Sequence, residues 1–308
     1  MFISKIYKVY DIKEINLPEM STLRLELENE VKKAMNDLVN KYANYCEIDG
    51  KVKNHDLVLL DFESNYEKFN KSNIPVVVGM GLFDKLFEGQ LINLNINNQV
   101  IMKLNKTDVK VTIKKIERKI LPDLNDDLVK MESIENVTKV NEYIRFIKEK
   151  VTTEKLNNLV NKIIPIIIEN SIFEISETDV NKLYECDYKK MRFLSEQENT
   201  VLEELSNREL GIRIGFGTLK EFEYIHKNER YPYLLKKALI GIILAKEDNI
   251  SFNKFSYELS LKNNSYYKQY SLSNSMKMQP FFSYLTYSYS KYLHEKLFKF
   301  YKEKLNQE

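Results

Sequence analysis

The feature of this sequence that most constrains its fold is a segment with strand-like periodicity enclosed between two segments with helix-like periodicity. Apolar residues recur at three- and four-residue steps through residues 19–45, which predicts a helix. From about residue 46 to residue 120 the pattern changes to short runs rich in β-branched residues. From residue 126 onward the helical periodicity returns. This order predicts an α+β chain in which a small β module interrupts a mostly helical body.

Four runs in the middle segment are predicted to be strands because they are apolar, β-branched and bounded by turn residues. They are His55–Phe62, Pro75–Gly79, Gln99–Leu104 and Val109–Ile116. The amphipathic stretch Leu82–Ile92 is predicted to form one short helix among them. At roughly 75 residues, the segment is small but can fold as one unit.

The C-terminal segment is predicted to be helical throughout, with Gly211, Gly215 and Gly217 in a loop. Pro165 is expected to kink the first of its helices, because proline lacks an amide donor. Ser176 and Asp179 have the spacing of a capping box and should start the second helix. The predicted helices cover residues 137–170, 176–208, 218–226, 231–247, 251–263 and 277–305.

Composition and motifs exclude several classes of function. The 308 residues carry a net charge of only +2, which argues against a dedicated nucleic-acid binder. The apolar runs are too short to span a bilayer, and we expect neither a secretory signal nor a membrane partner. Cys46 and Cys186 are read as reduced residues in a cytoplasm. The histidines lack metal-ligand spacing and no phosphate-binding loop is present, so no metal and no cofactor are expected.

Five stretches of the sequence, in this order and spacing, form an informative pattern. They are Val31–Ser64, Val77–Leu94, Ile113–Lys130, Ile167–Leu183 and Leu234–Leu259. Together they resemble bacterial trigger factors, chaperones that carry an FKBP-type prolyl isomerase (rotamase) domain.

The resemblance implies a domain organisation. Residues 46–120 would form an FKBP-like β-sheet module inserted in an elongated, mostly helical chaperone domain of the trigger factor and SurA type. Residues 1–45 and 121–308 would together form that discontinuous helical domain. The ribosome-binding domain found at the N-terminus of the family has no counterpart in these residues, so ribosome docking is not expected.

The resemblance also places an isomerase pocket, but with altered residues. Phe62, Phe69, Phe83 and Phe87 would be its aromatic walls, and the backbone amide of Asp84 would bind the substrate carbonyl. Asp84-Lys85-Leu86 replaces the family's isoleucine-proline-glycine, Asn70 replaces an FKBP aspartate, and Val109 replaces an aromatic wall residue. The flap is reduced to Lys103–Thr107. A carboxylate beside a pocket that must be dry is costly, so isomerase activity is expected to be weak or absent. The alternative for each phenylalanine is a place in the core.

A dense group of aromatic residues near the C-terminus is a candidate client-binding surface, because tyrosine and methionine suit adaptable contacts. Its members are Tyr267, Tyr270, Phe281, Phe282, Tyr284 and Tyr287. The alternative is that these rings pack between helices.

Three functions therefore remain open from the sequence. The first is an ATP-independent chaperone in the cytoplasm that binds unfolded or nascent polypeptides without docking on ribosomes. The second is an active prolyl isomerase that assists folding. The third is a dedicated partner of one specific client protein.

Overall fold

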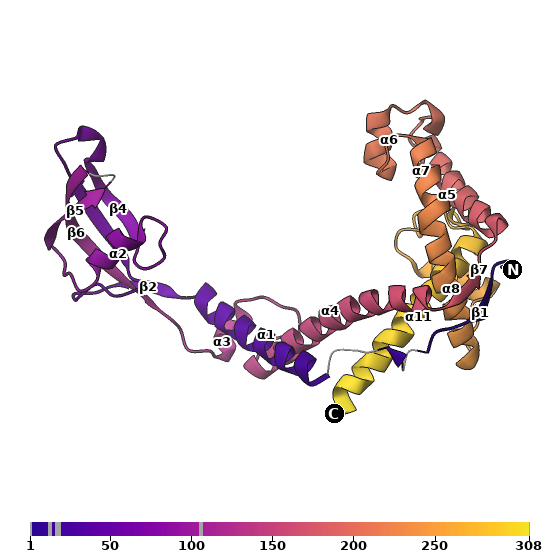
Figure 1. The fold of residues 1–308 in the computed structure, drawn as a ribbon, viewed down its shortest axis with the longest axis horizontal. Coiled ribbons are helices and arrows are strands. Elements are labelled where there is room, and N and C mark those ends of the chain that lie inside the picture. The colour runs from indigo at the N-terminus through magenta and orange to yellow at the C-terminus, as the bar shows by residue number, and fades with distance from the viewer. Residues whose placement is uncertain (1, 12–13, 16–19, 105–106, 308) are drawn as a thin grey trace. The chain divides into compact units, whose positions relative to one another are not determined.

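The computed structural model of the protein describes residues 2–11, 14–15, 20–104 and 107–307. Helices and antiparallel strands are both present, so the predicted α+β class is confirmed (Figure 1). The chain divides into two compact units. One comprises Glu26–Val151, and the other combines Met1–Leu25 with Thr152–Glu308. The domain boundaries expected at residues 45 and 121 stay a prediction.

The first unit contains a five-stranded antiparallel sheet built around one long strand. That strand, β6, pairs with β3 on one edge, and on its other edge with β2 at one end and β5 at the other. β4 pairs with the free side of β3. The strands are β2 (Asn44–Glu47), β3 (Leu57–Glu63), β4 (Lys71–Val77), β5 (Gln99–Leu104) and β6 (Thr107–Ile120).

Alternation of apolar residues places the core on one face of this sheet. On β6, Val109, Val111 and Ile113 are all fully buried. The helix α2 (Lys85–Leu91) covers them by inserting Phe87 and Leu91 into the same cluster. β3, β5, β6 and the short helix lie close to their predicted positions, whereas β4 begins at Lys71, four residues before the predicted Pro75.

The predicted helix over residues 19–45 is wrong at its C-terminal end. The helix α1 spans Met20–Lys41, and Asn44–Glu47 forms the strand β2 instead. β2 pairs in antiparallel register with the end of β6, from Asn44 opposite Ile120 to Glu47 opposite Glu117. Pairing with a partner distant in sequence overrides the local helical pattern, because it satisfies the backbone groups of both strands.

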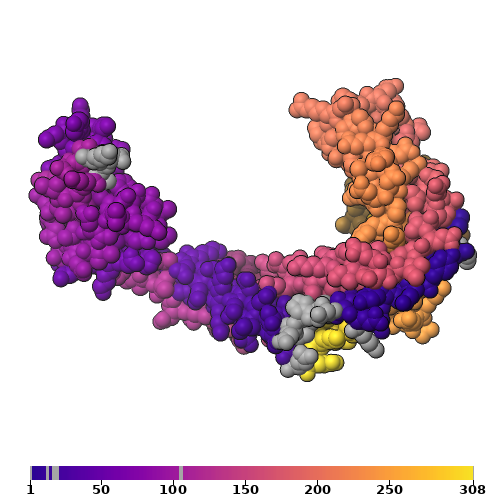
Figure 2. Space-filling view, in the orientation of Figure 1, coloured from indigo at the N-terminus to yellow at the C-terminus, as the bar shows by residue number. Residues whose placement is uncertain are grey.

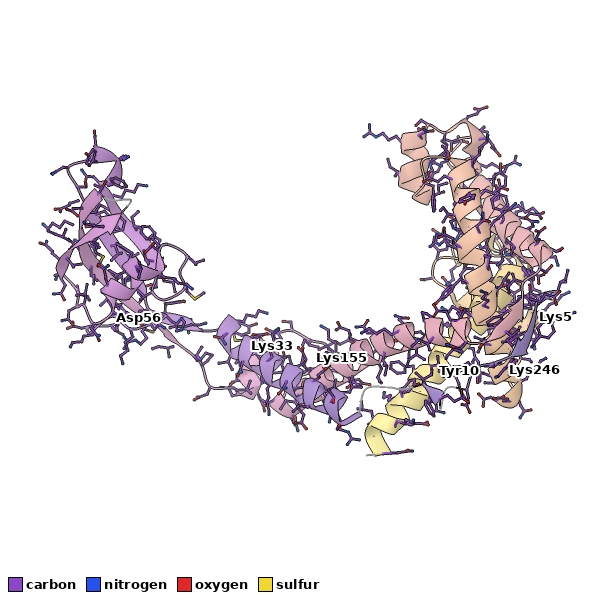
Figure 3. All side chains as sticks on the ribbon, viewed as in Figure 1. Lys5, Tyr10, Lys33, Asp56, Lys155 and Lys246 are labelled. Carbon is purple, nitrogen blue, oxygen red and sulfur yellow. The ribbon has the colours of Figure 1, made fainter. Side chains whose placement is uncertain are left out.

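An ion pair between a buried carboxylate and a partly exposed arginine holds the start of β3 to the end of β6. Asp56, labelled in Figure 3, accepts hydrogen bonds from Nε and Nη2 of Arg118 at 2.9 and 2.7 Å. The amide of Lys53 donates to the same carboxylate at 2.7 Å. Such a bidentate, charge-assisted pair is geometrically specific as well as strong.

Next to the sheet, helices α1, α3 (Asp126–Lys130) and the start of α4 (Val140–Glu169) share a small core of their own. Leu38 of α1 packs there with Leu128 and Val129 of α3 and with Tyr143 of α4. Pro165 lies inside α4, near its end.

The second unit is helical except for one short sheet. The strand β1 (Lys5–Lys8) pairs antiparallel with β7 (Ile172–Glu174), and neither strand was predicted. The remaining elements are α5 (Glu177–Gln197), a 3₁₀ turn (Leu202–Glu204), α6 (Asn207–Ile214), α7 (Leu219–Ile225), a π-helical turn (His226–Arg230), α8 (Tyr231–Glu247), α9 (Lys254–Asn263), α10 (Leu272–Met278) and α11 (Phe281–Gln307).

Two predicted helices in this unit are interrupted, each for a local reason. The helix that begins after Ser176 ends at Gln197 rather than residue 208. A new helix, α6, begins at Asn207, where Ser206 and Glu209 form a capping box. The helix predicted over 277–305 begins at Phe281, after Pro280 separates it from α10. Gly211, predicted in a loop, lies within α6 instead.

The N-terminal strand is held by a buried carboxylate. Asp179, on the first turn of α5, accepts hydrogen bonds from the amides of Ile3 and Ser4, both at 2.7 Å. Because these charge-assisted bonds lie in a buried site, they fix β1 against the helical body.

Helices α8 and α11 approach each other closely at a glycine. A Cβ added at Gly241 would lie 1.9 Å from the backbone oxygen of Tyr289. Glycine at this position therefore allows the contact between the two helices.

No helix of the described residues is long and apolar enough to cross a membrane.

We predict that Gly241→Ala destabilises the helical unit by about 1–3 kcal/mol, because the added methyl group must push the backbone of α11 away. Urea unfolding followed by circular dichroism measures the change in midpoint. Gly211→Ala is the matched control, since a Cβ there meets nothing within 4 Å. That control should be neutral or slightly stabilising, because alanine is the better helix former. Equal midpoints for Gly241→Ala and the parent would contradict the prediction.

Candidate functional site

Three of the predicted pocket phenylalanines are brought together in the β module. The ring centroids of Phe83 and Phe87 lie 4.9 Å apart. Phe62 lies 6.0 Å from Phe83 and 5.9 Å from Phe87. Phe62 and Phe87 are buried, whereas Phe83 is 43% exposed. Phe87 therefore packs in the core, as the alternative from the sequence held, and Phe83 faces outward.

A cleft of about 470 Å³ opens beside this aromatic group. Phe62, Phe69 and Phe83 line it together with Ile74, and Asp84 stands at its edge. Three lysines, Lys68, Lys71 and Lys103, complete the lining. Four of the five predicted pocket residues thus share one cleft, but charged groups surround it.

Asp84 has a structural task in this arrangement. It is the N-cap of α2, and its Oδ1 accepts a hydrogen bond from the amide of Phe87 at 2.8 Å. An N-cap acceptor of this kind stabilises a helix by about 1 kcal/mol. The side chain is therefore engaged with its own helix.

The loop before α2 is organised by a fully buried carboxylate that sequence reasoning missed. Glu88 accepts hydrogen bonds from the amides of Gly79, Gly81 and Phe83 at 2.9, 2.7 and 3.0 Å. Both glycines have positive φ, so the loop turns in a way that other residues rarely adopt. The glycine-rich sequence VGMGLF was the available signal for a loop that needs such a partner.

The environment of Glu88 keeps it ionised. Burial by itself raises the pKa of the carboxyl, but the amides of Phe83, Gly81, Gly79 and Asp84 outweigh this effect. The pKa therefore lies below its usual value of 4.5.

The same loop exposes large apolar side chains to solvent. Leu82 and Leu86 are 82% and 81% exposed, and Met80 is 52% exposed. With Phe83 they form what we call the apolar loop (Met80, Leu82, Phe83 and Leu86). Four exposed apolar side chains so close together in the sequence make this loop a candidate interaction surface.

The flap of the cleft falls partly outside the described residues. β5 and β6 pair as far as Leu104 opposite Thr107, and residues 105–106 between them lie outside the described range.

The structure distributes the predicted client-binding aromatics over several environments. Tyr284 is buried in a cluster with Tyr257, against which Phe281 and Tyr267 pack. Phe282 packs against another cluster, around Val180, Leu183, Tyr231 and Leu235, and lies 5.0 Å from the ring of Phe2. Tyr270 is half-buried, with its ring 6.2 Å from that of Phe193.

Of these six, Tyr287 alone is exposed, at 46%, and it lines a second cleft. This cleft of about 570 Å³ lies among α5, α6, α7, the π-helical turn, α8 and α11. Figure 2 shows these helices as one packed block, in salmon and orange. Among the residues that the structure describes, no cluster of histidine, cysteine and carboxylate side chains could hold a metal ion.

Comparison with known proteins adds the family context. No family model matches the chain. A trigger factor from Caldicellulosiruptor saccharolyticus is 24% identical over 280 residues, covering 83% of this chain and 60% of the relative. A Mesoplasma florum trigger factor is 25% identical over 219 residues, covering 59% and 51%. One from Francisella tularensis subsp. mediasiatica is 26% identical over 121 residues, covering 33% and 28%.

This chain resembles trigger factors. The resemblance inferred from the sequence is thus confirmed, and the chain spans about three-fifths or less of the length of these trigger factors. A solved trigger factor chaperone structure, from work on promiscuous substrate recognition in folding and assembly, aligns with 92% of this chain and 70% of that chain. The TM-score is 0.35 and the identity is 17%.

We predict that Glu88→Gln lowers the stability of the module by about 1–3 kcal/mol at neutral pH, because a neutral amide replaces the charged acceptor. The folded pKa of Glu88 is lowered, so its contribution is fully present above pH 4.5 and is lost as pH falls through the folded pKa. The difference between parent and variant should therefore shrink in acid.

Urea unfolding at several pH values measures this difference, and hydrogen exchange at the amides of Gly79 and Gly81 reports on the loop directly. Glu67→Gln, at an exposed position of the same module, is the control. It should change neither the unfolding free energy nor the hydrogen exchange of the two glycine amides. A variant difference that stays constant from neutral pH to acid would contradict the role of the charge.

Proposed function

We propose that this chain is an ATP-independent chaperone that binds unfolded polypeptides through exposed apolar surfaces. The observation that carries the proposal is the apolar loop. Leu82 and Leu86 are each more than four-fifths exposed and Met80 is about half exposed, while hydrogen bonds to the buried Glu88 hold the backbone of the loop in place. Similarity to trigger factors supports a chaperone role in general.

The energetics suit transient binding of varied clients. Covering apolar surface is worth about 25 cal/mol per Å², before the costs of association are subtracted. A few exposed side chains therefore give weak, readily reversible contacts. Such contacts need no nucleotide to drive release.

The helical unit would supply further client contacts. Tyr287 and its cleft are accessible, whereas Tyr284 is buried in the core of the unit. In this proposal residues 1–45 and 121–308 form the chaperone body and residues 46–120 an FKBP-like module. The protein would act in the cytoplasm, and this chain would not dock on ribosomes by itself.

Prolyl isomerisation is a second candidate function, favoured by the aromatic cleft of the module. We propose that this activity is weak or absent. The barrier of about 18–20 kcal/mol falls when an apolar pocket desolvates the imide. The cleft here is lined by three lysines, which would keep a bound imide close to charged groups and to the water that they hold.

We predict that the chain accelerates isomerisation of a proline-containing model peptide little or not at all above the uncatalysed rate. A protease-coupled assay, with a competent FKBP as positive control, measures this. Should weak acceleration appear, Phe83→Ala should abolish it without unfolding the module, because Phe83 is partly exposed. A rate comparable to that of ordinary FKBPs would overturn the proposal.

We predict that the double variant Leu82→Ser, Leu86→Ser protects an aggregating client less well than the parent, with unchanged stability. Both side chains are almost fully exposed, so the fold does not depend on them. Light scattering of a chemically unfolded client, diluted into buffer with each chaperone variant, measures the protection.

Ile101→Ser is the matched control, because Ile101 is a 71% exposed apolar residue on β5 of the same module. It should leave protection close to that of the parent. If the double variant protects as well as the parent, the apolar loop is not a client surface.

A further inference from the structure

The cleft of the helical unit is lined by charged side chains as well as by apolar ones. Its floor is made by Met191, Leu194, Ile214, Phe222 and Leu234, from several different helices. Tyr233, Tyr266 and Tyr287 line the same cleft and are partly open to solvent. A cleft of about 570 Å³ holds a few side chains of a bound chain rather than a folded surface.

The charges that line this cleft are strongly unbalanced. Lys190, Arg213, Arg230 and Lys237 face a single carboxylate, Asp187. That carboxylate accepts a hydrogen bond from the hydroxyl of Tyr231 at 2.8 Å. Arg213 pairs with Glu198 at 2.6 Å, outside the lining. Within the described part of the chain, the other three cations make no salt bridge.

Arg230 is held in place without being neutralised. Its Nη1 lies 2.9 Å from Nε2 of His226, and Nδ1 of the same ring lies 2.9 Å from the carbonyl oxygen of Phe222. Nδ1 must donate to that carbonyl, which leaves Nε2 to accept from the guanidinium. His226 stacks on Phe222 at 3.9 Å, so the ring cannot turn away. The arginine is thus positioned by a neutral partner and keeps its full charge.

Lys237 is a second cation without a carboxylate partner, although its Nζ lies 6.0 Å from the centroid of the Tyr233 ring. It is half-buried on α8, and burial lowers the pKa of its ammonium group. A partly desolvated charge without a counter-ion is unfavourable, and a carboxylate brought by a ligand would relieve it. Lys190, half-buried on α5, adds a third such group to the cleft.

We propose that this cleft binds extended client segments in which acidic residues stand beside aromatic or aliphatic ones. The apolar floor and the tyrosines would take the apolar side chains, and the unpaired cations would take the carboxylates. The inference rests on the proposed function and adds the class of client sequence that one site selects. A long nucleic acid fits less well, because the chain as a whole carries a net charge of only +2.

The test uses short labelled peptides of equal apolar content whose remaining positions are acidic, neutral or basic. Fluorescence anisotropy with the full chain should give the tightest dissociation constant for the acidic peptide, about tenfold below that of the basic one. Added salt should weaken binding of the acidic peptide and leave the affinity for the neutral peptide nearly unchanged, because screening acts only on the charged contacts. Equal affinity for all three peptides would overturn the proposal.

The triple variant Lys190→Gln, Arg230→Gln, Lys237→Gln should lose the preference and keep its affinity for the neutral peptide. Glutamine at position 230 can still donate to His226, and circular dichroism checks that the variant folds. The matched control, Lys189→Gln, Lys254→Gln, Lys302→Gln, removes the same charge at exposed positions of the same unit. It should retain the preference. Equal loss in both variants would mean that net charge, not the cleft, makes the selection.

Two further outcomes separate this inference from the proposed function. If the chain protects an unfolded client but shows no acidic preference, only the assignment of the cleft fails. If it neither protects a client nor binds any peptide, the proposed function fails. An oligonucleotide that displaces the acidic peptide at equal concentration would assign the cleft to nucleic acid and overturn the proposal.

Discussion

The pairing of β2 with the end of β6 is the interaction on which the arrangement of the first unit depends. It brings residues 44–47, where the chain enters the sheet, beside residues 117–120, where the chain leaves it. α1 precedes this entry and α3 follows the exit, so the two helices start out as neighbours and can share the core around Leu38 and Leu128. The bidentate pair between Asp56 and Arg118 holds the start of β3 at the same place. A β module closed in this way can sit inside a helical sequence without opening either core.

Much of this architecture follows from periodicity. β3, β5 and β6 lie close to their predicted positions, because alternation over a buried face is a strong local signal. β2, β1 and β7 could not be predicted in the same way. Each is three or four residues long, and each is a strand only because a distant segment pairs with it. The apolar periodicity predicted a helix through residues 44 and 45 because it reflects only local preference. It carries no information on β6, the strand with which these residues pair.

The candidate sites divide along the same line. Aromatic residues that the motif placed together are together, since Phe62, Phe83 and Phe87 contact one another. What the sequence could not tell is which ring is exposed. Burial separates Phe87 from Phe83, and Tyr284 from Tyr287, although each pair lies on neighbouring stretches of chain. In the sequence, an aromatic residue looks the same whether its ring is buried in a core or exposed to a client. A dense group of aromatic residues therefore indicates where a surface could lie, but not which of the rings are exposed.

The two candidate client surfaces share one physical design. In each surface, a buried polar group fixes the position of a neighbouring backbone segment or side chain. The groups that would contact the client stay exposed to solvent. Glu88 uses its charge on loop amides, so that the apolar loop faces solvent on a fixed backbone. His226 uses an uncharged ring nitrogen on Arg230, so that the guanidinium is held in place and still lacks a counter-ion. A surface fixed in this way loses little conformational entropy when it binds. In the proposed function the client segment would bear most of the ordering cost, which would keep affinity low and exchange fast, as a chaperone without a nucleotide cycle requires.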